Sequence, residues 1–157
     1  RKSVMESAQT SFISSTFWTE RIGPTAALKT LEVMERTKSW EIITEQGKKM
    51  QNKWKELADS YNLSINVSGM PALSTYSFNS ENALAYKTFI TQEMLKKGFL
   101  ASTNFYACTA HQDSHINLYF EALDNVYSDI SKCEKGLKDI YKMLEGPICH
   151  SGFSRLN

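Results

Sequence analysis

A chain of 157 residues, 41% of them hydrophobic, is long enough to bury one core, or one core and a small appendage. Its net charge of +1 creates no field that would gather nucleic acid or an anionic membrane, so we expect neither as a partner. No apolar run approaches the roughly 20 residues that cross a bilayer, and the first residues lack the apolar centre of a signal peptide. The three cysteines have no framework spacing, which indicates free thiols and a cytoplasmic protein.

The N-terminal part of the chain is predicted to be largely helical. Residues 2–9 suit a short helix, and the polar stretch 10–20 is expected to be a loop. Pro24 stands where a helix start tolerates it, and residues 25–36 gather apolar side chains on one face. The clearest helix lies between residues 40 and 61, where apolar residues recur in steps of three and four over about six turns. This stripe comprises Trp40, Ile43, Gly47, Met50, Trp54, Leu57 and Tyr61.

The middle of the chain changes from a helical to an alternating pattern. Residues 63–69 and 72–78 alternate apolar and polar side chains around a Gly-Met-Pro sequence, which predicts two short strands joined by a turn. Residues 81–97 then predict a helix that ends at a glycine. Two further short strands are expected at 99–103 and 105–109.

The C-terminal part returns to helical spacing. Residues 113–130 carry apolar side chains in regular helical register, and the pattern resumes from Leu137 to Leu144 beyond a break at Gly136. Helices thus stand before, between and after the short strands. This order predicts an α/β fold in which one sheet is covered by helices.

A cluster of hydroxyl side chains lies near the start of the chain. Ser14, Ser15 and Thr16 precede a Gly-Pro turn that leads into the helix expected at 25–36. Hydroxyl groups and backbone amides suit the oxygens of a phosphate group, because charge-assisted hydrogen bonds are the strong ones. The same residues also suit an ordinary polar loop, so the pattern alone leaves both interpretations open.

A second cluster suggests a metal. Cys108, His111 and His115 have the spacing C-x2-H-x3-H, which invites a zinc hypothesis. A fourth ligand is not evident in the sequence, and the two histidines flank an expected helix start, where Asp113 and Ser114 suit capping. The metal site is therefore an alternative and not the main prediction.

Three stretches together carry a family resemblance. They are Ser14-Ser15-Thr16-Phe17 before a helix ending "TLEVME", then "EMLKKGFLAST", then "TAHQDSHINLYFEALDNVY". In this order they resemble the C-terminal part of a class III aminotransferase, the group of pyridoxal-phosphate (PLP) transferases that includes glutamate-1-semialdehyde aminomutase. The resemblance runs over nearly the whole chain.

The resemblance implies a fold and a domain organisation. It implies the C-terminal small domain of a fold-type-I PLP enzyme, with a short, mainly antiparallel sheet covered by helices, preceded by a remnant of the large domain. Residues 1–36 would then be the end of the large cofactor-binding domain and the interdomain helix. Residues 37–157 would form the small domain.

The resemblance also implies a cofactor site shared between two subunits of a homodimer. Thr16 would donate its hydroxyl to the PLP phosphate of the opposite subunit, with Ser15 beside it. The lysine that binds the cofactor covalently would lie upstream of this chain, so no catalytic residue is expected here and the fragment alone would be inactive. The full enzyme would transfer an amino group from a small-molecule donor to a carbonyl acceptor.

The loop departs from the family pattern on its substrate side. The family follows the threonine with Gly-Asn-Pro, whereas this chain has Trp18-Thr19-Glu20-Arg21. Arginine binds carboxylates bidentately, so Glu20 and Arg21 are candidates for contact with a substrate carboxylate or amine. The alternative for this pair is a solvated ion pair. For the whole chain, the alternative is a stand-alone α/β interaction module without catalytic activity.

Overall fold

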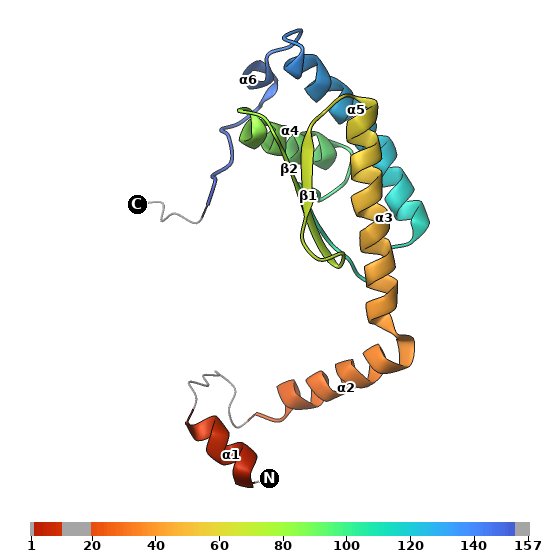
Figure 1. Ribbon diagram of the computed structural model, residues 1–157, viewed down its shortest axis with the longest axis vertical. Coiled ribbons are helices and arrows are strands. Elements are labelled where there is room, and N and C mark those ends of the chain that lie inside the picture. The colour runs from red at the N-terminus through yellow and green to blue at the C-terminus, as the bar shows by residue number, and fades with distance from the viewer. Residues whose placement is uncertain (1, 11–19, 153–157) are drawn as a thin grey trace. The chain divides into compact units, whose positions relative to one another are not determined.

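The computed structural model describes residues 2–10 and 20–152 and divides the chain into two units, Arg1–Lys38 and Ser39–Asn157 (Figure 1). Assigning them to a large and a small enzyme domain, with the predicted boundary between residues 36 and 37, stays a prediction.

The first unit contains two helices, α1 (Lys2–Gln9) and α2 (Ile22–Thr37). Lys38 ends α2 in a left-handed conformation with φ 48°, and its N–H bonds back to the carbonyls of Met34 and Glu35. Neither helix buries a side chain, so both depend on their own backbone hydrogen bonds within this unit.

The second unit begins with the long helix α3 (Ser39–Ser60). Its buried residues include Gly47, Met50 and Trp54, which confirms that the predicted stripe faces the core. Gly47 is needed there, because a Cβ at this position would overlap the backbone carbonyl of Pro71 in the turn after β1. The turn between the first two strands thus lies directly against α3.

The sheet has three antiparallel strands in the order β1 (Ile65–Ser68), β2 (Leu73–Phe78) and β3 (Asn104–Tyr106). The predicted hairpin of the first two strands is confirmed, with its turn at Gly69, where φ is +86°. In the pairing, Val67 faces Tyr76 and Ser74 faces Phe105.

The prediction of a strand at 99–103 is wrong. Gly98, at φ +84°, turns the chain after the helix, and residues 99–103 run in irregular backbone up to β3. Only at Thr103 does the backbone reach β2, where its carbonyl accepts the N–H of Tyr76 at 2.9 Å. The strand predicted at 105–109 exists, but it begins one residue earlier and ends at Tyr106, because the backbone turns at residues 109–110 before the next helix.

Three helices pack on one face of the sheet (Figure 1). They are α3, α4 (Ala83–Lys96) and α5 (Asp113–Glu134), and the short helix α6 (Ile140–Met143) packs on α4. Tyr76 and Phe78 of β2 carry this packing, since their rings contact Trp54, Tyr86 and Tyr127 on α3, α4 and α5. The opposite face holds exposed side chains, including Leu73 and Tyr106. This arrangement confirms the predicted α/β class with an antiparallel sheet covered by helices.

Candidate functional site

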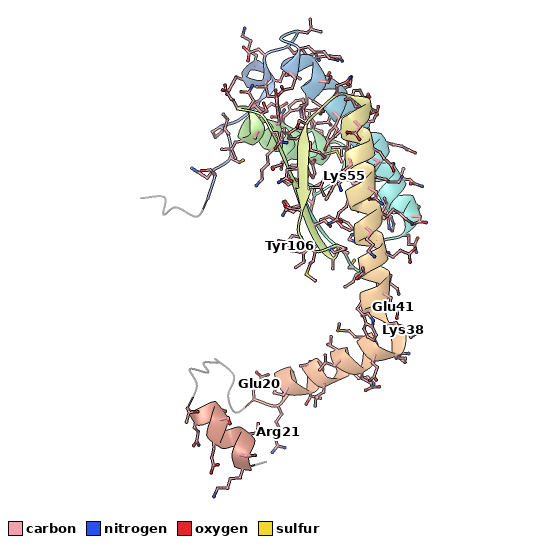
Figure 2. All side chains as sticks on the ribbon, viewed as in Figure 1. Glu20, Arg21, Lys38, Glu41, Lys55 and Tyr106 are labelled. Carbon is pink, nitrogen blue, oxygen red and sulfur yellow. The ribbon has the colours of Figure 1, made fainter. Side chains whose placement is uncertain are left out.

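The residues expected to bind a phosphate, Ser15 and Thr16, lie outside the described residues. The two candidates that follow them are described at the start of α2 (Figure 2). Glu20 is half-buried and directly precedes the helix cap, and Arg21 is the exposed cap residue itself. The Arg21 carbonyl accepts the N–H of Thr25 at 3.0 Å, so this residue begins the helical hydrogen bonding.

The position of Arg21 suits the binding of an anion. This residue stands at the N-terminus of α2, which carries the positive end of the helix dipole. A guanidinium at that end adds a full positive charge and a planar set of donors. The role of Glu20 and Arg21 in substrate binding stays a prediction.

The residues of the metal hypothesis are engaged in other contacts. His111 accepts the backbone N–H of Cys108 on its Nδ1 at 3.1 Å, and His115 accepts the N–H of Gln112 on its Nδ1 at 3.2 Å. Within the described residues, no group of three or more His, Cys, Asp or Glu is placed to hold a metal ion. The structure therefore gives the zinc alternative no support.

The two histidines instead line a pocket in the second unit. This pocket has a volume of about 300 Å³ and lies between α3, β3 and the start of α5. We call it the histidine pocket, and its other walls are mainly apolar and aromatic: Met50, Trp54, Phe99, Phe105, Tyr106 and Tyr119. Sequence reasoning singled out the histidines as possible ligands of a metal but did not find the pocket, because its walls come from four separate stretches of the chain.

Tyrosines with altered pKa values lie in or beside the core. Burial raises the pKa of Tyr119 to about 12, and its hydroxyl accepts the indole N–H of Trp54 at 3.1 Å. Burial likewise raises the pKa of Tyr76 and Tyr127. These phenols therefore stay protonated near neutral pH and act as packing groups.

The lysines give no candidate for covalent catalysis in the part of the chain that the structure describes. A nucleophilic lysine needs a desolvated pocket that lowers its pKa. Every described lysine is exposed or half-buried, and several are held in ion pairs, such as Lys49 with Asp113 and Lys96 with Glu93. None of the described helices is long and apolar enough to cross a membrane.

The fold is similar to part of a solved protein structure. The fold resembles part of the FumI protein of Sphingopyxis sp. MTA144, a structure of its PLP internal aldimine form. The TM-score is 0.69 at 17% sequence identity, covering 89% of this chain and 34% of FumI. The chain thus has a fold found in a PLP-bound protein, in agreement with the predicted fold.

A curated protein also matches by sequence. The 3-aminobutyryl-CoA aminotransferase of Cloacimonas acidaminovorans (strain Evry) is 25% identical over 126 residues, which cover 77% of this chain and 30% of that protein. No model of a protein family matches the chain. The chain spans about a third of the length of both proteins, and its similarity to an aminotransferase agrees with the predicted class at this coarser level.

Proposed function

We propose that the chain is the C-terminal portion of a PLP-dependent aminotransferase that moves an amino group from a small-molecule donor to a carbonyl acceptor. The observation that carries this proposal is the agreement of two independent comparisons. A sequence match to an aminotransferase and a structural match to a PLP-bound protein both extend over more than three quarters of this chain. Fold alone does not define function, so the sequence match is the necessary second line of support.

The finer assignment follows the resemblance noted in the sequence. We propose a class III enzyme of the cytoplasm, in the group that includes glutamate-1-semialdehyde aminomutase. Both transfer between two molecules and rearrangement within one are open to an enzyme of this group. The match to a 3-aminobutyryl-CoA aminotransferase favours transfer between molecules.

The described residues do not by themselves fit the cofactor. PLP supplies an electron sink for the carbanion formed at the substrate, and it needs a buried lysine and a phosphate site. The described lysines are at the surface or half-buried, and the proposed phosphate contacts, Ser15 and Thr16, lie outside the described residues. The proposal therefore assigns the reacting groups to polypeptide beyond these 157 residues.

The surface of α2 supports a larger assembly. Three large apolar side chains of this helix are exposed: Ile22 by 76%, Leu28 by 69% and Leu31 by 61%. Exposed apolar side chains gathered on one element mark surfaces that other structure covers. In the proposed enzyme, the large domain and the second subunit of a homodimer cover α2, and the adjacent loop reaches the partner's cofactor phosphate.

The test is to characterise the longest natural product of the gene. We expect a protein about three times as long, with a lysine-bearing cofactor domain, visible absorbance from bound PLP, and amino-group transfer in a coupled assay. Replacement of that lysine by alanine is the matched control, and it should abolish transfer and change the absorbance while the dimer stays intact. A natural product of this length that neither binds PLP nor gains it from a partner chain would overturn the proposal.

A further inference from the structure

The histidine pocket has the size and lining of a small-ligand site. Its volume of about 300 Å³ is at the lower end of the range in which proteins bind small molecules. Of the lining residues, Trp54 is fully buried, whereas Tyr106 is 67% exposed. Aromatic walls of this kind favour a flat apolar group, which they contact with a large area.

The two imidazoles give the pocket a defined polarity. A neutral histidine has one nitrogen that accepts and one that donates. Because backbone N–H groups donate to Nδ1 of both His111 and His115, the proton of each neutral ring must be on Nε2. The His111 ring also packs against the ring of Phe105 in a tilted arrangement, with centroids 4.9 Å apart, which restricts the orientation of this imidazole. The lining of the pocket thus includes two imidazoles whose Nδ1 is occupied and whose Nε2–H can donate to a ligand.

Among the described residues that line the pocket none carries a carboxylate, which favours an anion over a cation as its ligand. Asp113, two residues before His115, is paired with the ammonium group of Lys49 on α3. Lys53, one turn further along α3, donates to the neutral side chain of Asn117 at 2.9 Å and lies over the ring of Phe120. The charge of Asp113 is thus compensated by Lys49, and both of these contacts of Lys53 are with neutral groups.

We propose that the histidine pocket binds a small carboxylate with an aromatic body. The ring of the ligand packs among the aromatic walls, and the carboxylate accepts hydrogen bonds from the Nε2–H groups of His111 and His115. This proposal concerns the second unit alone and does not rest on aminotransferase activity. It gives the two histidines a role that the proposed function does not provide.

The test uses three probes that share a phenyl ring and differ in the head group: phenylacetate, phenethyl alcohol and phenethylamine. Each is titrated into the 157-residue protein by calorimetry at neutral pH. We expect phenylacetate to bind with a Kd on the order of 1 mM, as befits so few atoms, and about tenfold more tightly than the alcohol. Equal affinity for all three head groups, or no binding of phenylacetate, overturns the proposal.

Matched variants test the donors. His115→Phe keeps a ring but removes both nitrogens, so the affinity for phenylacetate should fall about fivefold to tenfold. His150→Phe changes the remaining histidine of the chain, which is not part of the pocket, and should leave this affinity unchanged. Equal losses in the two variants contradict the proposal.

A spectroscopic measurement on the unmodified protein tests the same donors without any variant that would have to fold. Long-range proton–nitrogen NMR spectra of the unmodified protein should assign the Nε2–H tautomer to His111 and His115, and phenylacetate should shift both Nε2 resonances. An Nδ1–H tautomer at both positions, or resonances that do not respond to the probe, would refute the assigned donors.

Discussion

The indole nitrogen of Trp54 on α3 donates a hydrogen bond to the hydroxyl of Tyr119 on α5 at 3.1 Å. Trp54 has no exposed surface, so this bond satisfies a buried donor and joins two helices at the wall of the histidine pocket. Trp54 belongs to the core and Tyr119 packs against it, and both also line the pocket.

The first prediction follows from this bond. Tyr119→Phe removes the acceptor while it keeps the ring, and the indole N–H is left buried without a partner. We expect the free energy of unfolding to fall by about 1–3 kcal/mol, the range for an unsatisfied buried group. Urea denaturation measures this loss. Tyr106→Phe is the control, because Tyr106 is mostly exposed, and a change of equal size in both variants would contradict the explanation.

A second prediction concerns Gly47, where α3 meets the turn between β1 and β2. Alanine is the better helix former by about 1 kcal/mol, so propensity alone predicts that Gly47→Ala stabilises the protein. The added Cβ would overlap the Pro71 carbonyl, and backbone cannot move aside cheaply. We expect a net loss of about 2–4 kcal/mol in the free energy of unfolding.

Gly23→Ala is the matched control for this change. Gly23 also lies in a helix, α2, but a Cβ there meets nothing within 4 Å. Circular dichroism should show equal or greater helix content for Gly23→Ala, together with an unchanged denaturation midpoint of the second unit. A Gly47→Ala variant that is as stable as the original chain would show that the two segments do not touch in solution.

These elements also show what the sequence could predict. The α3 stripe was predictable because a period of three to four residues encodes one buried face, and Gly47, Met50 and Trp54 all lie on that face. The hairpin was predictable because alternation on both sides of Gly69 encodes two paired strands. Both signals are local.

Other features depend on contacts that sequence does not encode locally. Residues 99–103 were expected to form a short strand, but whether that backbone reaches β2 depends on the turn at Gly98, and only Thr103 does so. The spacing of His111 and His115 suggested metal ligands, because the pattern cannot reveal that backbone amides already occupy both Nδ1 atoms. The pocket itself requires the tertiary fold.

A third prediction concerns the pH dependence of stability. Asp129 on α5 accepts hydrogen bonds from Lys132 at 3.0 Å and Lys138 at 2.9 Å. Burial by itself raises the pKa of this carboxyl, but the two lysines outweigh it and hold the pKa below its ordinary value. A carboxyl whose pKa is lower in the folded state stabilises the protein above its unfolded pKa. That contribution is lost as the pH falls through the folded pKa.

Asp129→Asn should therefore lower the free energy of unfolding near pH 7 by about 0.5–1 kcal/mol, a value discounted for partial exposure. The difference between variant and original should vanish at an acidic pH below the lowered pKa of Asp129, where both side chains are neutral. Urea denaturation at the two pH values measures this. Asp59→Asn, an exposed change of the same kind on α3, is the control. A difference for Asp129→Asn that persists in acid would point to packing instead of charge.

A fourth prediction tests the proposed phosphate contact. In the proposed full-length dimer, Thr16→Val keeps the shape of the side chain but removes the hydroxyl proposed to donate to the cofactor phosphate. The affinity for PLP should fall by about 1–3 kcal/mol, measured as cofactor loss on dialysis or by titration of the apoenzyme. Thr30→Val is the control, because its hydroxyl bonds to the Ala26 carbonyl within α2. Equal PLP affinity in the Thr16→Val variant and the original enzyme would remove Thr16 from the site.

The last prediction concerns Arg21, the exposed cap residue of α2 (Figure 2). If its guanidinium binds the substrate carboxylate, Arg21→Gln in the intact enzyme should raise KM for that substrate by about tenfold or more, since charge-assisted hydrogen bonds are lost. Because the contact is made equally in the ground and transition states, kcat should change little. Arg21→Lys should recover only part of the affinity, because an ammonium group cannot bind bidentately. Arg36→Gln removes the same charge near the other end of α2 and should leave KM unchanged, so a similar rise in both variants would indicate a general field effect.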